Sequence, residues 1–429
     1  MINGSRVYAP RRNVRYYMAS PPFPPVRPLP ESPDFMSISA NVRDMRPSAT
    51  IAVSSLARRL ADEGRDIINL SAGEPDFETP GFISEAAIDG IRAGRTNYTP
   101  APGLPELRKA IAAVLSERAG RELPWDGVVV STGAKQALFN TCFSLFGPGD
   151  DVLIGAPYWT SYPEMVGLSR AEAVAVAGAE ERDFRLTPKD LDAAATDRTR
   201  GLLFSSPGNP TGVVYSTAEL RAIAEWARDR GVCLIADEIY RPIFFGDGTE
   251  APSILDLPPE SLGEHVLIDG ASKAFAMTGW RIGFSLSSPE LAKTMSGLQS
   301  HTTSNPSTPS QVAALAAYTE TEKTAAAVGE MREAFRRRRD LVCRLFDEKL
   351  PGFPYLTPEG AFYLFFRVDG AFDDERSSAS DLCTWVLEEC GVALVPGEAF
   401  GEPRFVRMSY ATSDEVLERA IERLADLFG

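Results

Sequence analysis

The chain has 429 residues, of which 44% are hydrophobic and 24% charged, as in a soluble globular protein long enough for two domains or for one large and one smaller domain. A net charge of −15 argues against nucleic acid as a partner, and the sequence contains no apolar run long enough to span a membrane. With two histidines and five dispersed cysteines, we expect no metal site, no disulfide framework and a cytoplasmic location with reduced thiols.

Residues 1–35 differ from the rest of the chain. They contain five arginines and the run P-P-F-P-P-V-R-P-L-P, without hydrophobic periodicity. This composition predicts a disordered extension. A transit peptide is less well supported, because proline breaks the amphipathic helix that such a peptide needs. A start assigned too early, with Met36 as the true first residue, is a further alternative.

Residues 36–85 are predicted to form the N-terminal part of a small domain. A helix is expected over Ile51–Glu63, after the segment R-P-S-A-T at 46–50. A short strand then leads into S-A-G-E-P-D-F at 71–77. The chain next enters the large domain, expected over residues 86–325.

Strands and helices alternate along residues 86–325, which predicts an α/β fold with a mostly parallel sheet flanked by helices. We expect seven strands in this sheet. Those that the sequence delimits are Gly127–Val130, Asp151–Ile154, Gly201–Phe204, Val232–Ala236, Val266–Ile268 and Ile282–Leu286.

Residues 326–429 are predicted to complete the smaller α+β domain. A long helix is expected at about Ala325–Lys349, and its R-R-R-R run at 336–339 is interpreted as a solvated face. Strands are expected at Ala361–Arg367, Val392–Val395 and Phe405–Ser409, followed by a helix from Ser413.

The stretch G-A-S-K-A-F-A-M-T-G-W-R-I-G at 270–283 contains the most informative lysine of the chain. An amine such as that of Lys273 can form a Schiff base with a carbonyl cofactor. The hydroxyl of Ser272 and the guanidinium of Arg281 are suited to holding a phosphate nearby. A lone lysine in such a turn would be an ordinary surface residue, so the other motifs must support this interpretation.

Two further motifs follow predicted strands. Asp237 ends the apolar run of G-V-C-L-I-A-D-E-I-Y, and ligands of open α/β sheets bind at the carboxyl ends of strands. Asn209 lies in the rigid turn S-S-P-G-N-P-T-G at 205–212. The alternatives are a helix cap for Asp237 and an ordinary loop for Asn209.

Three more segments could contribute to the same site. Gly133, Ala134 and Lys135 join a strand to a helix in V-V-V-S-T-G-A-K-Q-A-L, and free N–H groups at a helix start attract phosphate. Trp159 lies in A-P-Y-W-T-S-Y-P and Arg407 in F-V-R-M-S-Y-A-T. A guanidinium grips a carboxylate well. Taken singly, a core tryptophan and a surface strand arginine remain open alternatives.

Together, and in this order from residue 48 to 412, the motifs resemble those of class I aminotransferases, the aspartate aminotransferase-like family of fold type I, and within it the aspartate/prephenate subgroup. The resemblance implies pyridoxal 5′-phosphate (PLP) as cofactor, bound covalently by Lys273. It implies that Asp237 pairs with the pyridinium nitrogen, that Tyr240 contacts the phenolic oxygen and that Trp159 stacks on the ring. It also implies a homodimer in which Tyr98, in N-Y-T-P-A-P-G, reaches the phosphate of the partner subunit.

The resemblance also implies which residues bind the substrate, an L-amino acid or a 2-oxo acid. Arg407 would hold its α-carboxylate and the backbone of Gly73 would lie against it. Ser48, Thr50 and Lys135 would approach its side chain, which suggests an acidic substrate. The alternatives are a helix cap for Ser48 and a solvated residue for Lys135. His301, in the loop Q-S-H-T-T-S-N-P-S, is either a surface residue or a substrate contact.

We therefore predict a PLP-dependent aminotransferase. The same motifs fit a PLP-dependent lyase, a β/γ-substitution enzyme or a cyclase of a specialised pathway, because fold does not fix function. A transcriptional regulator with an aminotransferase-like domain is disfavoured, since the N-terminal extension cannot form a helix-turn-helix and the chain is acidic.

Overall fold

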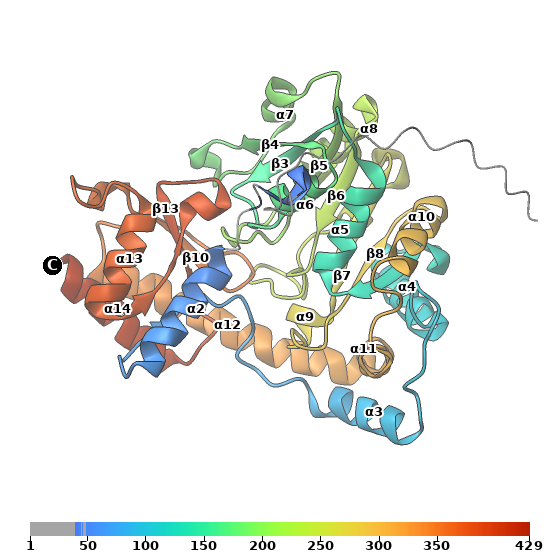
Figure 1. Cartoon of the computed structure of the whole chain (residues 1–429), viewed down its shortest axis with the longest axis horizontal. Helices are drawn as coiled ribbons and strands as arrows, with labels where there is room; N and C mark the ends of the chain where they lie inside the picture. Colours follow the sequence, from blue (N-terminus) through green and yellow to red (C-terminus); the bar gives the residue numbers. More distant parts are fainter. Residues whose placement is uncertain (1–38, 44, 46–48) are drawn as a thin grey trace, which may run out of the picture.

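The computed structural model describes residues 39–43, 45 and 49–429. The predicted extension at 1–35 and the predicted substrate residue Ser48 lie outside these residues. Figure 1 shows the two parts of the molecule, one built around a large sheet and the other formed by the end of the chain together with the helix α2 (Ala49–Asp62). No helix of the described part is long and apolar enough to cross a membrane.

The large part is built on a seven-stranded sheet in the order β2-β8-β7-β6-β5-β3-β4. β8 runs antiparallel to both of its neighbours, and the other pairs are parallel. This confirms the predicted α/β class and the mostly parallel seven-stranded sheet. The strands are β2 (Val128–Thr132), β3 (Asp151–Ala156), β4 (Glu172–Ala177), β5 (Thr199–Ser205), β6 (Cys233–Asp237), β7 (His265–Gly270) and β8 (Ile282–Leu286).

Helices bury both faces of this sheet, which explains why its central strands are continuously apolar. On β5 and β6, successive side chains enter different cores. Leu202 and Leu234 pack in a core with α4, α8 and α11, whereas Leu203 and Ile235 pack in another with α5 and α6. The helices of this part are α3 (Gly81–Arg92), α4 (Pro105–Ala119), α5 (Ala134–Leu145), α6 (Tyr162–Leu168), α7 (Pro188–Ala194), α8 (Thr217–Arg230), α9 (Ala271–Ala274), α10 (Pro289–Ser300) and α11 (Thr308–Thr319).

The smaller part contains an antiparallel sheet in the order β12-β13-β10-β9. The N-terminal segment joins the smaller part through a separate two-stranded sheet, in which β1 pairs in parallel with β11. The long helix α12 (Thr321–Lys349) runs beneath both parts in Figure 1. The remaining elements of this part are α2 (Ala49–Asp62), β1 (Ile68–Asn69), β9 (Tyr355–Leu356), β10 (Tyr363–Arg367), α13 (Ala379–Cys390), β11 (Val392–Ala393), β12 (Val395–Pro396), β13 (Phe405–Ser409) and α14 (Asp414–Phe428). The short helix α1 (Ala40–Arg43) lies against α6 of the large part. The domain boundaries at residues 85 and 325 stay predictions.

The prediction that the arginine run of α12 is a solvated face is wrong for two of its four residues, Arg338 and Arg339. The side chain of Arg338 is 9% exposed and that of Arg339 is 17% exposed. Because an α-helix turns about 100° per residue, four consecutive side chains cover most of its circumference and cannot all face solvent. Arg337, in contrast, is 61% exposed.

Candidate active site

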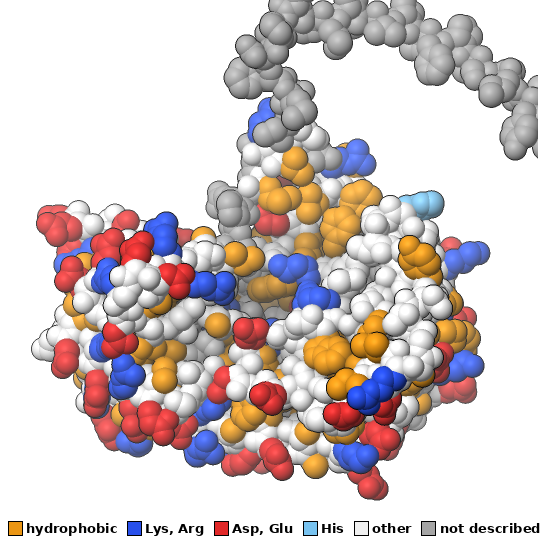
Figure 2. Space-filling view, turned by 60° about the horizontal axis from the view of Figure 1, so that its bottom comes forward, with side chains coloured by type: hydrophobic (Ala, Val, Ile, Leu, Met, Phe, Trp, Pro, Cys, Tyr) orange, Lys and Arg blue, Asp and Glu red, His pale blue; other side chains and the backbone are white. Residues whose placement is uncertain are grey.

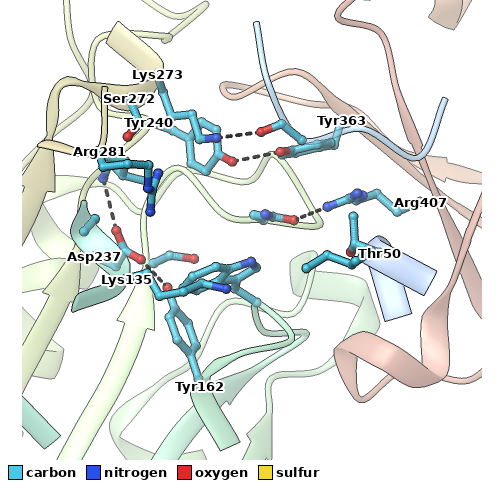
Figure 3. A pocket seen from close by; sticks show the side chains of 17 residues that line it. Thr50, Lys135, Tyr162, Asp237, Tyr240, Ser272, Lys273, Arg281, Tyr363 and Arg407 are labelled. Carbon is cyan, nitrogen blue, oxygen red and sulfur yellow. Dashed lines mark hydrogen bonds between the residues drawn. The ribbon is translucent and has the colours of Figure 1, made fainter. Parts of the chain in front are cut away.

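A cavity of about 320 Å³ lies at the carboxyl ends of the central strands and faces the small sheet. In the space-filling view the hollow in the middle of the molecule contains basic side chains (Figure 2). The structure brings most of the predicted site residues together here (Figure 3). Those lining the cavity are Thr50, Gly73, Ala134, Lys135, Trp159, Asn209, Asp237, Tyr240, Ser272, Lys273, Arg281 and Arg407.

Lys273 enters the cavity from the short helix α9, directly after β7. At Gly270, where strand becomes helix, a Cβ would lie 2.7 Å from the Cα of Gly283, so the close approach of two strands requires glycine. The Lys273 ammonium donates to the carbonyl oxygen of Gly73 at 2.5 Å. Burial lowers the pKa of Lys273 to about 8, against an opposing effect of the Glu74 carboxylate. The amine is therefore accessible in its neutral form near neutral pH.

Asp237 lies at the end of β6, opposite Lys273 across the cavity. Its carboxylate accepts hydrogen bonds from the Tyr162 hydroxyl at 2.7 Å and from the backbone N–H of Ile239 at 3.2 Å. Burial raises the pKa of Asp237 to about 6, and the two hydrogen bonds oppose this rise. Tyr162 was not predicted from the sequence, although it lies in the same A-P-Y-W-T-S-Y-P motif as Trp159.

A cationic corner forms where α5 begins. Gly133 has a φ of +81°, and a Cβ there would lie 2.6 Å from Nη2 of Arg281. The glycine thus lets the guanidinium approach the start of the helix, whose first N–H groups have no partner within the helix. Arg281 donates to the carbonyl of Thr278 at 2.9 Å, and Ser272 is buried beside it in the cavity wall. This arrangement is suited to a phosphate group.

Arg407, which belongs to β13, closes the side of the cavity opposite the cationic corner. It is 1% exposed and donates to Asn209 Oδ1 at 3.0 Å and to the carbonyl of Ser71 at 2.7 Å. Its Nε is buried with no hydrogen-bond partner among the described residues. Its guanidinium carbon lies 4.3 Å from the ring centre of Tyr363. It also lies 5.0 Å from the ring centre of Phe400. Among the described residues, this buried guanidinium donates only to neutral oxygens and packs on aromatic rings, which leaves it available for a carboxylate ligand.

Tyr363 is a further cavity residue that was not predicted, as are Ile51, Ser205 and Ile239. The hydroxyl of Tyr363 and that of Tyr240 form a hydrogen bond of 2.8 Å, and a Cβ on Gly73 would lie 3.0 Å from the same Tyr363 oxygen. Tyr363 begins β10, two residues before Phe365, which pairs with Arg407 in the antiparallel ladder. Only the cross-strand register, not a local motif, could have indicated it.

Lys135 and Trp159 form the wall beside the cationic corner. The Lys135 ammonium lies 4.8 Å from the ring centre of Trp159, and the indole packs edge-on against Tyr162 with ring centres 5.6 Å apart. Burial, followed by the charge of Arg281, lowers the pKa of Lys135. Thr50 reaches the cavity from the first turn of α2.

Three predicted or discussed residues are not part of the cavity wall. Gly133 lies directly behind it, against Arg281. Tyr98 is 92% exposed on the surface, so in this chain it does not contribute to its own cavity. His301 is an exposed residue that ends α10.

Comparisons with known proteins agree with this geometry. Residues 65–424 match the model of the family aminotransferase class I and II. The chain is 41% identical over 392 residues to an aspartate aminotransferase of Geobacillus stearothermophilus, covering 91% of this chain and 98% of that one. It is 42% identical over 394 residues to an aspartate/prephenate aminotransferase of Cereibacter sphaeroides, covering 90% and 97%.

The fold is similar to that of the Thermus thermophilus aspartate aminotransferase solved with maleate. The TM-score is 0.86 at 39% identity, covering 92% of this chain and 100% of that one. The chain belongs to the class I and II aminotransferase family. It is a PLP-dependent transferase, and amino acids and 2-oxo acids are its class of substrate.

Proposed function

We propose that this enzyme transfers the amino group of an acidic L-amino acid, aspartate or glutamate, to a 2-oxo acid. The charge of the cavity carries this proposal. Four cations line the cavity, namely Lys135, Lys273, Arg281 and Arg407, against the single carboxylate of Asp237. Arg281 suits the cofactor phosphate, Arg407 suits the substrate α-carboxylate, and Lys273 suits the cofactor carbonyl. Lys135 is left for a second substrate carboxylate.

The residues present fit PLP. The observations that support this are the crowded Gly133–Arg281 corner, the desolvated amine of Lys273 and the buried carboxylate of Asp237. Bound there, PLP would supply an electron sink that stabilises negative charge at the substrate Cα. The residues that we propose hold it are Lys273, Asp237, Tyr240, Ser272, Arg281, Asn209, Trp159 and, through the start of α5, Gly133, Ala134 and Lys135.

The substrate would lie between this cofactor group and the small sheet. Arg407 would bind the α-carboxylate in a bidentate fork, with Asn209 fixing the guanidinium. Gly73 and Trp159 would confine the substrate, and Lys135 and Thr50 would receive its side chain. We propose the same side-chain role for Ser48. Relatives named aspartate and aspartate/prephenate aminotransferases, and the maleate in the Thermus structure, support a dicarboxylate.

Lys273 would act as the base and acid of the reaction. Its Nζ would take the proton from the substrate Cα and hold it for return within the site. This role requires the neutral amine, and burial favours that form by lowering the pKa of Lys273 to about 8. Asp237 would keep a hydrogen-bonded negative charge at the far end of the site.

We further propose a cytoplasmic homodimer. Exposed apolar side chains support the dimer, because Tyr98, Ile51 and Phe143 are 92%, 62% and 45% exposed. In the dimer, Tyr98 would reach the phosphate of the partner subunit. Sedimentation of the purified protein tests the dimer, and a monomer at micromolar concentration would contradict it.

A half-reaction tests the proposed substrate. The enzyme with PLP is mixed with one amino acid and no 2-oxo acid, and the absorbance of the bound cofactor is followed. Aspartate and glutamate should convert it at least about tenfold faster than leucine, since a charge-assisted hydrogen bond is worth about 1.5–3 kcal/mol. A 2-oxo acid should reverse the change. Equal rates for leucine and aspartate would contradict an acidic substrate, and a product that no 2-oxo acid reverses would favour the lyase or cyclase alternative.

A further inference from the structure

Arg338 of α12 and Asp76 of the preceding segment form a bidentate ion pair outside the cavity. The two hydrogen bonds are 2.7 Å and 2.8 Å long. The arginine side chain is 9% exposed and the aspartate 28%. The guanidinium carbon also lies 5.4 Å and 5.7 Å from the ring centres of Phe77 and Phe335. A planar fork held between two rings fixes the orientation of the carboxylate, which a single surface contact would not do.

Asp76 belongs to the segment that borders the active site, residues 70–80 between β1 and α3. Within it, the carbonyl of Ser71 accepts from Arg407 and that of Gly73 accepts from Lys273. Gly73 also lines the cavity. This irregular segment therefore contacts both the amine and the guanidinium that the proposed reaction needs.

The segment crosses from the smaller part of the molecule to the larger one just after Asp76. At its start, the carbonyl of Leu70 accepts from Ser409 N–H at 2.8 Å. At its end, the Thr79 hydroxyl donates to the carbonyl of Ala276 at 2.8 Å. Between these two ends, the ion pair of Asp76 with Arg338 connects the middle of the segment to α12. The packing of Phe335 in the core of the smaller part makes α12 a firm support for this bond.

We infer that Arg338 and Asp76 are positioning residues, which hold the Gly73 segment in place so that Lys273 and the carboxylate-binding side of the cavity keep their geometry. The inference rests on the proposed roles of Lys273 and Arg407. Neither Arg338 nor Asp76 lines the cavity, so the pair acts through the backbone of residues 71–76.

Binding of maleate to the enzyme with PLP tests this inference, because maleate is a dicarboxylate that has no amino group to transfer. Asp76→Asn and Arg338→Lys each break the fork while keeping the size of the side chain. Each should raise the dissociation constant for maleate about tenfold. Arg344→Met is the matched control: it removes an exposed charge on the same helix, whose ion pair joins Glu348, and should change the constant less than about twofold.

A spectroscopic readout separates positioning from simple destabilisation. Glu74 and Asp237 raise the pKa of Lys273, whereas Arg281 and Arg407 lower it. The same charges would act on the protonated nitrogen that Lys273 contributes when PLP is bound. If the segment shifts, the Glu74 carboxylate moves away from that nitrogen, and the midpoint of the pH-dependent absorbance change of the enzyme with PLP should fall in both variants. The double variant Asp76→Asn with Arg338→Lys should bind maleate no more weakly than the single variants do, because the two residues act as one unit.

Variants that unfold at lower temperature but keep the wild-type maleate affinity and absorbance midpoint would overturn the inference. If Arg338→Lys does not fold, Asp76→Asn decides the matter, since it alters only a partly exposed carboxylate. Failure of the proposed function has a different signature, in which the wild-type enzyme does not bind maleate. In that case the absorbance midpoints of the variants still decide the role of the pair.

Discussion

The Tyr162 hydroxyl donates a 2.7 Å hydrogen bond to the buried carboxylate of Asp237, and both side chains line the active-site cavity. This bond opposes the effect of burial, which alone raises the pKa of Asp237. A tyrosine of α6 thus helps to keep a carboxylate of β6 ionised in a desolvated place. The contact joins two elements that are distant in sequence.

Tyr162→Phe should therefore raise the pKa of Asp237 and slow the half-reaction. We expect a loss of about tenfold at neutral pH, since a hydrogen bond to a charged group is worth about 1.5–3 kcal/mol. The ionised form of Asp237 is needed, so activity falls as the pH drops through its pKa, and this acidic limb should move to higher pH in the variant. Asp237→Asn should cost more activity than any other single change except that of Lys273. Tyr410→Phe, which removes a buried hydroxyl outside the cavity, should leave the pH profile unchanged.

Gly133→Ala should weaken PLP binding by about tenfold or more, measured by titrating the apoprotein with PLP. The new Cβ would lie 2.6 Å from the Arg281 guanidinium and would also require an L-residue at a φ of +81°. Gly120→Ala is the matched control, because Gly120 has a φ of +61° with nothing within 4 Å of a Cβ. Similar PLP affinities for the two variants would mean that crowding at Arg281 does not matter.

Local sequence patterns were sufficient for much of the fold. Ile282–Leu286 and Phe405–Ser409 are strands with the predicted bounds. Strand β4 was not predicted, because Glu172–Ala177 lies at the sheet edge, where small residues give a weak apolar signal. Three polar positions that escaped prediction in and around the site share one cause. Tyr162, Tyr363 and Arg338 acquire their partners only through tertiary contacts with residues far away in the sequence.

Lys273→Ala should abolish the covalent adduct that borohydride traps between the protein and PLP, as detected by mass spectrometry of the digested protein. The wild-type adduct should map to Lys273, because this amine lines the cavity and is desolvated. Trapping at another lysine would overturn the proposed cofactor site.

Lys273→Met should stabilise the cofactor-free protein at pH 7. Burial lowers the pKa of Lys273 from 10.5 to about 8, so the unfolded chain binds this proton more tightly than the folded one. The cost of folding with a charged lysine is fully present below about pH 8 and disappears as the pH rises towards about 10. The rise in Tm should therefore be clear at pH 7 and small at pH 10. Lys293→Met, at an exposed position on α10, is the control and should change the Tm little, because substitutions of exposed side chains have small effects on stability.

Lys135→Met should raise the KM for aspartate about ten- to hundredfold and that for an apolar amino acid much less. The Lys135 ammonium lies over the Trp159 ring, where an aromatic face holds the cation without neutralising it. No carboxylate of the described residues pairs with Lys135, so a substrate carboxylate would be its anionic partner. A charge-assisted bond of about 1.5–3 kcal/mol corresponds to one to two decades in specificity. Lys135→Arg, which keeps the charge, should retain the preference for aspartate. An equal rise in KM for both amino acids would assign Lys135 to the start of α5 or to the phosphate, and the acidic specificity would then need another cation.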